Sequence, residues 1–79
     1  MTRQSQTENR IYVELTEDAQ DALAGFPFRH GQYIAEEYEA EDGRDTKFVD
    51  IELGDRNDTD AAQEQFLNTN RQVISYGVR

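Results

Sequence analysis

The sequence predicts a single small α+β domain with the element order β-α-β-β-α-β. Four segments alternate apolar and polar residues with the period of a strand, and two segments space their apolar residues as helices do. An Asp-Gly dipeptide lies between the two middle strand-like segments, which favours a hairpin at that point. A chain of 79 residues is long enough for one core and too short for two.

The N-terminal part predicts a tail, a strand and a short helix. Residues 1–9 are polar and aperiodic, which predicts a flexible tail ahead of one domain spanning residues 10–79. "RIYVELT" at residues 10–16 alternates apolar and polar side chains and is typical of a half-buried strand. A helix of two to three turns is expected next, with Thr16 as its N-cap and Gly25 near its end.

The middle part predicts a hairpin. Residues 32–40 contain formers of both helix and strand, and the Asp42-Gly43 dipeptide decides in favour of a strand. "KFVDIEL" at residues 47–53 alternates clearly and predicts the partner strand.

The C-terminal part predicts a second helix and a last strand. Asp58 or Thr59 is the expected helix cap, and the apolar spacing runs to about Thr69. Residues 71–79 predict a strand with Ile74, Tyr76 and Val78 on one face. Right-handed connections would give a ferredoxin-like antiparallel sheet with both helices on one face and the other face open.

A two-residue turn at Asp42-Gly43 fixes the register of the predicted hairpin. This turn pairs Tyr33 with Glu52 and leaves no two like charges directly opposed. The open face would then carry residues from three strands: Tyr12, Glu14, Tyr33, Glu37, Glu39, Phe48, Asp50 and Glu52. The sequence therefore predicts one coherent negative surface with aromatic side chains within it.

The charge is strongly negative and unevenly distributed. The chain has 17 acidic and 8 basic residues, for a net charge of −9. Residues 36–60 hold eleven of the acids and three of the basic residues. This balance excludes a nucleic-acid-binding protein of the usual electrostatic kind. It indicates a basic partner, a salt-adapted habitat or a need for solubility, and the clustering favours a partner.

The sequence offers little material for catalysis or metal binding. Cysteine is absent and His30 is the one histidine, so no nucleophile–base pair can be assembled, and we expect neither enzyme activity nor a cofactor. The segment containing Asp55, Asp58 and Asp60 approaches a calcium-loop pattern but lacks its glycine and final glutamate, so helix capping is the better reading. No apolar run is long enough to span a membrane, and a soluble, cytoplasmic protein is expected.

The loop "FPFRH" offers a minority alternative. Its two aromatic residues flank a proline beside basic groups, and we expect Phe26 to be buried in the core. Phe28 and Arg29 would remain as a candidate protein-binding loop.

In size, acidity, lack of catalytic groups and the acidic block at 36–60, the chain resembles small anti-defence proteins of bacteriophages. These include anti-CRISPR proteins and DNA-mimic anti-restriction proteins, and the resemblance rests on size and charge rather than on a motif. It implies a stoichiometric inhibitor of a nucleic-acid-binding defence complex, above all a CRISPR surveillance complex, in the cytoplasm of a host bacterium.

The expected interface combines carboxylates that stand in for phosphates with aromatic side chains that pack. Carboxylates on alternate residues of a strand lie about 6.6–7 Å apart. The expected partner-binding residues are Tyr33, Glu36, Glu37, Tyr38, Glu39, Glu41, Asp42, Phe48, Asp50 and Glu52. The alternative is a small structural or regulatory interaction domain from a salt-adapted organism, which would spread its acids evenly over the surface.

Overall fold

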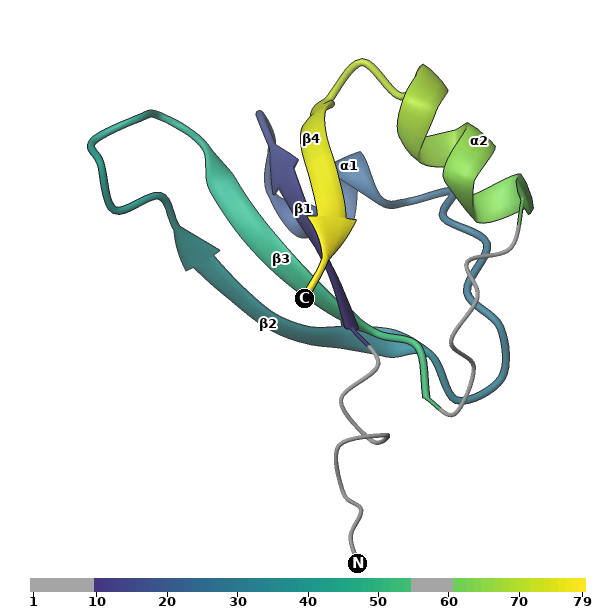
Figure 1. The fold of residues 1–79 in the computed structure, drawn as a ribbon. Coiled ribbons are helices and arrows are strands. Elements are labelled where there is room, and N and C mark those ends of the chain that lie inside the picture. The colour runs from purple at the N-terminus through teal and green to yellow at the C-terminus, as the bar shows by residue number, and fades with distance from the viewer. Residues whose placement is uncertain (1–9, 55–60) are drawn as a thin grey trace, which may run out of the picture.

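A computed structural model describes residues 10–54 and 61–79, and its elements follow the predicted order (Figure 1). They are β1 (Arg10–Leu15), α1 (Ala19–Ala22), β2 (Tyr33–Glu39), β3 (Lys47–Glu52), α2 (Ala61–Thr69) and β4 (Val73–Val78). The expected tail at 1–9, the helix caps Asp58 and Thr59, and the segment from Asp55 to Asp60 lie outside the described residues. No helix in the described ranges is long and apolar enough to cross a membrane.

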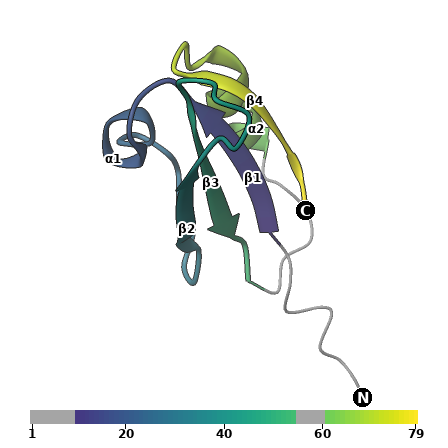
Figure 2. The same ribbon diagram turned by 90° about the vertical axis from the view of Figure 1, so that its left-hand side faces the viewer.

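The four strands form one antiparallel sheet in the order β2-β3-β1-β4. Figure 2 shows the strands side by side in this order, with β3 and β1 in the centre and β2 and β4 at the edges. The connection between β2 and β3 projects away from the rest of the sheet (Figure 1).

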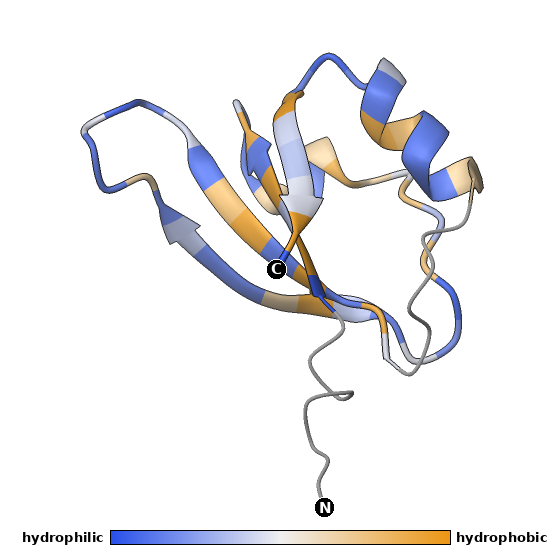
Figure 3. Cartoon of the chain, in the orientation of Figure 1, coloured by the Kyte–Doolittle hydropathy of each residue, from blue (hydrophilic) through white to orange (hydrophobic). Residues whose placement is uncertain are grey.

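One face of the sheet packs against both helices. Hydrophobic and hydrophilic residues alternate along β1 and β3 (Figure 3), and the hydrophobic set points to the helices. The buried core consists of Ile11, Val13, Leu15, Ala19, Ala22, Leu23, Phe26, Val49, Ile51, Leu53 and Leu67. This confirms the predicted burial of Phe26, and within residues 10–54 and 61–79 no helix covers the second sheet face.

The first helix is shorter than predicted. The helix α1 has four residues and is capped by Asp18, whose Oδ1 accepts a hydrogen bond from the Asp21 amide at 3.0 Å. The prediction of Thr16 as the cap is wrong, because the Thr16 amide donates to the Gln72 carbonyl at 2.9 Å. Thr16 therefore continues the backbone pairing of β1 toward the last strand instead of starting the helix.

The last strand departs from strict alternation. A register shift between Glu14 and Leu15 places Val73 opposite Leu15. Val73 therefore packs on the core, whereas Ile74 is 50% exposed. Tyr76 and Val78 pair with Val13 and Ile11, as a shared face predicts, whereas Ile74 falls at the register shift and has no residue directly opposite it on β1.

The hairpin pairs as predicted at one end only. Tyr33 lies opposite Glu52 and Ile34 opposite Ile51, as expected, and the register then shifts by one residue at Ala35. The Ala40 amide donates to the Thr46 carbonyl at 3.3 Å, so the strands are joined by the loop 41–45. The predicted two-residue turn is therefore wrong.

Candidate protein-interaction surface

The open sheet face is built by alternate residues of all four strands. Tyr12 lies between Asp50 on β3 and Gly77 on β4, and Glu14 lies between Phe48 and Ser75. On β2 the same face carries Tyr33, Glu36 and Tyr38, which pair with Glu52, Asp50 and Phe48. The predicted placement of Tyr12, Glu14, Tyr33, Phe48, Asp50 and Glu52 on this face is confirmed.

Glu37 and Glu39 lie on the opposite face, which corrects the prediction. The extra residue at Ala35 moves them opposite Val49 and Lys47, whose side is the helix side. The Glu37 carboxylate accepts from the Ala19 amide at 3.5 Å, at the first turn of α1. The shifted register thus brings Tyr38 beside Phe48 and gives Glu37 a contact with the helix.

The acids of the two central strands are buried and paired with arginines. Glu14, Asp50 and Glu52 are each 7% exposed or less. Glu14 pairs with Arg44 at 3.0 Å, Asp50 with Arg79 at 2.9 Å and Glu52 with Arg10 at 2.9 Å. The expected coherent negative plane is therefore wrong, because three guanidinium groups neutralise it.

Glu14 lies deepest in this arrangement. Besides Arg44, its carboxylate accepts hydrogen bonds from the Thr46 hydroxyl at 2.8 Å and the Ser75 hydroxyl at 3.1 Å. Residues from β1, β4 and the 41–45 loop region are tied together at this point, so the loop is anchored to the sheet.

Asp50 carries a raised pKa. Burial is the main cause, the charge of Glu36 opposite it adds to the effect, and Arg10 partly lowers the pKa. The expectation that no like charges are directly opposed is wrong at this pair. The Asp50 carboxylate also accepts from the Tyr38 hydroxyl at 3.4 Å.

Three aromatic rings lie together on the open face. The rings of Tyr38 and Phe48 stack at 5.7 Å between centroids, and Tyr12 lies 6.3 Å from Phe48. The Arg79 guanidinium lies 5.1 Å from the Tyr12 ring centroid and donates to the Tyr38 hydroxyl. Arg44 lies over Phe48 at 5.8 Å. Each arginine therefore combines an ion pair with a cation–π contact.

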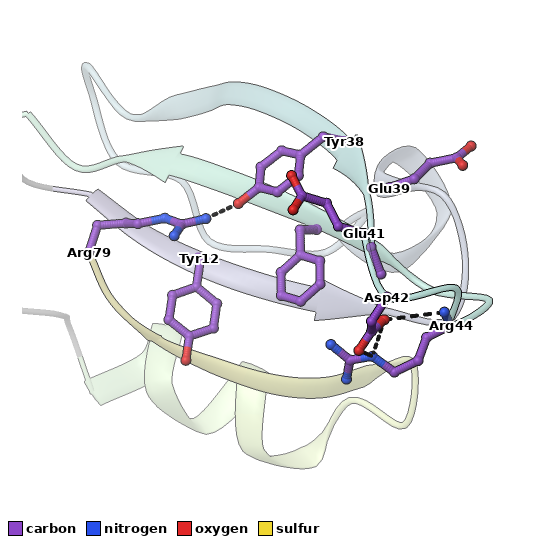
Figure 4. A pocket seen from close by; sticks show the side chains of 9 residues that line it. Tyr12, Tyr38, Glu39, Glu41, Asp42, Arg44 and Arg79 are labelled. Carbon is purple, nitrogen blue, oxygen red and sulfur yellow. Dashed lines mark hydrogen bonds and ion pairs between the residues drawn. The ribbon is translucent and has the colours of Figure 1, made fainter.

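A hollow of about 520 Å³ opens beside these rings (Figure 4). The rings, both arginines and the loop carboxylates of Glu41 and Asp42 line it. Glu39 also contributes to the lining, although Figure 4 shows its carboxylate directed away.

The exposed acids gather in a second place, at the projecting end of β2 and the loop after it. We call residues 36–45 the acidic hairpin. It carries six exposed carboxylates and one basic residue, Arg44. The acids are Glu36, Glu37, Glu39, Glu41, Asp42 and Asp45.

Within the acidic hairpin, Asp42 and Arg44 form a local pair. The Arg44 Nε donates to Asp42 at 2.9 Å, and this hydrogen bond is the main cause that lowers the Asp42 pKa and raises the Arg44 pKa. Within the described ranges, Glu41 has no ion pair or side-chain hydrogen bond.

No protein-family model, curated protein or solved structure matches the chain. Function is therefore inferred from the surface of the molecule itself. The described ranges contain no group of three or more side chains suited to hold a metal ion.

The expected interface residues divide into groups. Tyr38, Glu41, Asp42 and Phe48 meet at the hollow, whereas Tyr33 and Glu52 pair at the far end of the hairpin. His30 is exposed in a turn, and the rings of Phe28 and Phe26 lie 4.7 Å apart between centroids.

The ion pairs of Arg10, Arg44 and Arg79 with buried acids were not predicted from the sequence. Arg10 lies two residues before Tyr12, so strand alternation is the signal that could have placed it on the open face. Its pairing with Glu52 requires the β1–β3 register, which no local pattern reveals.

Proposed function

We propose that the protein is a stoichiometric inhibitor of a bacterial nucleic-acid-binding defence complex, most notably a CRISPR surveillance complex. It binds the basic nucleic-acid site of that complex through the acidic hairpin. The observation that carries the proposal is the separation of the carboxylates on the strands and on the β2–β3 connection into two groups. Those on the central strands are buried and paired, whereas six on the acidic hairpin are exposed beside one arginine.

The acidic hairpin suits a site that normally holds phosphates. Glu37 and Glu39 lie two residues apart on one strand face, about 6.6–6.8 Å along the strand. The loop adds Glu41, Asp42 and Asp45 beyond the end of the strand. A projecting element with closely spaced anions offers Lys and Arg side chains a substitute for the nucleic-acid backbone.

The mechanism proposed is occupancy of a site, without a catalytic step, metal or cofactor. We also infer a ferredoxin-like fold, which is supported by the element order and the central position of β1 and β3. The proposed target places the protein in the cytoplasm of the host bacterium.

A direct test measures target-DNA binding by a panel of CRISPR surveillance complexes and other DNA-binding defence complexes. The full chain is titrated into each complex at 50, 150 and 500 mM salt, and DNA binding is followed by fluorescence anisotropy. We expect one complex to lose DNA binding at an equimolar ratio. The inhibitor's own affinity should fall as salt rises, because screening weakens contacts between exposed charges.

A matched pair of variants tests the surface. Glu39→Gln/Glu41→Gln removes two charges from the acidic hairpin, and Asp21→Asn/Glu64→Gln removes the same charge from exposed positions outside it. The first variant should lose inhibition and the second should keep most of it. DNA binding that is unchanged across the panel at low salt, or equal losses in both variants, would overturn the proposal.

A further inference from the structure

The hollow beside the aromatic rings has the composition of a site for a cationic side chain. Its volume of about 520 Å³ exceeds that of one amino-acid side chain, and three aromatic rings contribute to its wall. We propose that it binds one arginine side chain of the partner protein, with the guanidinium against the rings and ion-paired to Glu41. The identity of that partner rests on the proposed function, whereas the chemistry of the hollow does not.

The protein's own arginines show that these rings accept guanidinium groups. Arg79 lies 5.1 Å from the Tyr12 centroid and 5.8 Å from the Tyr38 centroid. Arg44 approaches the Phe48 ring at 5.8 Å. These distances are within the range in which the negative face of a ring attracts a cation. A guanidinium group from a partner would make the same kind of cation–π contact that Arg44 and Arg79 already make with these rings.

The charges around the hollow favour a cation over an anion. Arg44 and Arg79 are each engaged by a buried carboxylate, Glu14 and Asp50 respectively, so their charges are already compensated. Glu41 lines the same hollow and has no ion pair within residues 10–54 and 61–79. Glu41 and Tyr38 both line the hollow, as labelled in Figure 4. An incoming cation therefore meets a carboxylate and an aromatic wall together.

Aromatic rings on a sheet can also stack on nucleobases, but the negative charge around this hollow disfavours nucleic acid as the ligand. Aromatic side chains on an open sheet serve single-stranded nucleic acid when basic residues hold the phosphates. Here the rim of the hollow carries Glu39, Glu41 and Asp42, and the whole chain has a net charge of −9. Phosphates would be repelled from this rim.

Nuclear magnetic resonance of the labelled full chain tests the inference without any defence complex. The probes are acetyl-Gly-Arg-Gly-amide, the same peptide with citrulline in place of arginine, and an eight-residue oligothymidine. We expect the arginine peptide to shift the ring protons of Tyr12, Tyr38 and Phe48 in a saturable way. The neutral citrulline peptide should bind at least about three-fold more weakly, because it cannot form the ion pair or the cation–π contact.

Two single variants identify the contact. Glu41→Gln should weaken the arginine peptide about two- to five-fold. Glu64→Gln removes the same charge from a residue outside both the hollow and the acidic hairpin and should leave the affinity unchanged. Both positions are exposed, so neither change threatens the fold.

Equal binding of the two peptides, or ring shifts caused by the oligothymidine alone, would overturn this inference. The proposed function would still stand if the defence complex remained inhibited. Conversely, arginine binding at the hollow without inhibition of any complex would overturn the proposed function and leave the guanidinium site intact.

Discussion

At the scale of single residues, Tyr12 and Gly77 show how closely the open face is packed. A Cβ added at Gly77 would lie 2.7 Å from Tyr12 Cε2 and 2.8 Å from its hydroxyl oxygen. These distances are too short for non-bonded atoms, so the Tyr12 ring occupies the space that a side chain at position 77 would need. Gly77 is therefore required by its neighbour and not by its own backbone angles.

We predict that Gly77→Ala lowers the free energy of unfolding by about 1–3 kcal/mol, since the ring must move away from Arg79. Gly25→Ala is the matched control, because its Cβ would lie 3.7 Å from Phe66, an ordinary contact, and should change stability by about 0.5 kcal/mol or less. Urea unfolding of both variants gives the comparison. Equal stabilities would contradict the close approach of Tyr12.

Two aspartates are expected to titrate on opposite sides of 3.8, the ordinary value for this side chain. Burial and Glu36 raise the pKa of Asp50, whereas the hydrogen bond from Arg44 lowers that of Asp42. Carbon-detected titration of the two carboxyl groups checks this order. An Asp50 midpoint at or below that of Asp42 would contradict it.

The raised pKa of Asp50 fixes the direction in which folding stability changes with pH. The folded state holds the Asp50 proton more tightly than the unfolded chain, so the stability gained is fully present below pH 3.8 and is lost as pH rises through the folded-state pKa. Asp50→Asn should therefore gain stability relative to the wild type as pH rises through that window. For exposed Asp42 the sign is opposite and the effect is small.

At the scale of elements, the bulge at Ala35 determines which carboxylates of β2 lie on the open face and which lie on the helix side. Ala35 is the residue left out of the ladder between the Ile34–Ile51 and Glu36–Asp50 pairs. Deleting Ala35 should keep every pair on both sides and preserve the fold. Deleting Glu37 together with Ala35 removes one paired residue as well and should place Tyr38 opposite Val49, off the open face.

Nuclear Overhauser contacts between the Tyr38 and Phe48 rings distinguish the two deletions. The contacts should persist when Ala35 alone is deleted and disappear when Glu37 is deleted as well, because only the double deletion reverses the alternation next to the loop. Loss of the ring contacts in the Ala35 deletion would show that the bulge itself holds the register.

The sequence predicted the strands well because their alternation is local. The core residues of β1 and β3 and the Tyr33–Glu52 pair could be read directly from it. The Asp42-Gly43 dipeptide predicted a two-residue turn that does not form. Arg44 and Thr46 instead contact Glu14 on β1, and these contacts stabilise a wider loop. Such distant pairing leaves no periodic trace in the sequence.

At the scale of the whole molecule, the net charge of −9 implies self-repulsion, concentrated in the acidic hairpin. Screening shortens the range of charge interactions from about 10 Å at 0.1 M salt to about 3 Å at 1 M. We predict that the melting temperature rises with potassium chloride mainly below about 0.5 M and then levels off. The Glu39→Gln/Glu41→Gln variant should show a smaller rise.

Calorimetry from 0.02 to 3 M potassium chloride makes this comparison. A melting temperature that keeps climbing to 3 M, equally in the variant and the wild type, would favour the salt-adapted interaction domain over an inhibitor with a dedicated surface.

The two edge strands of the sheet, β2 and β4, differ in charge and in exposed apolar surface, and this difference affects solubility. The strand β2 presents Glu36, Glu37 and Glu39 along its border, which discourages another chain from adding a strand. The strand β4 instead exposes Ile74 by 50% and Val78 by 79%. In concentrated solution the protein should therefore self-associate or form fibrils through the edge strand β4. The anionic edge strand β2 should not take part, so it remains accessible to a different protein.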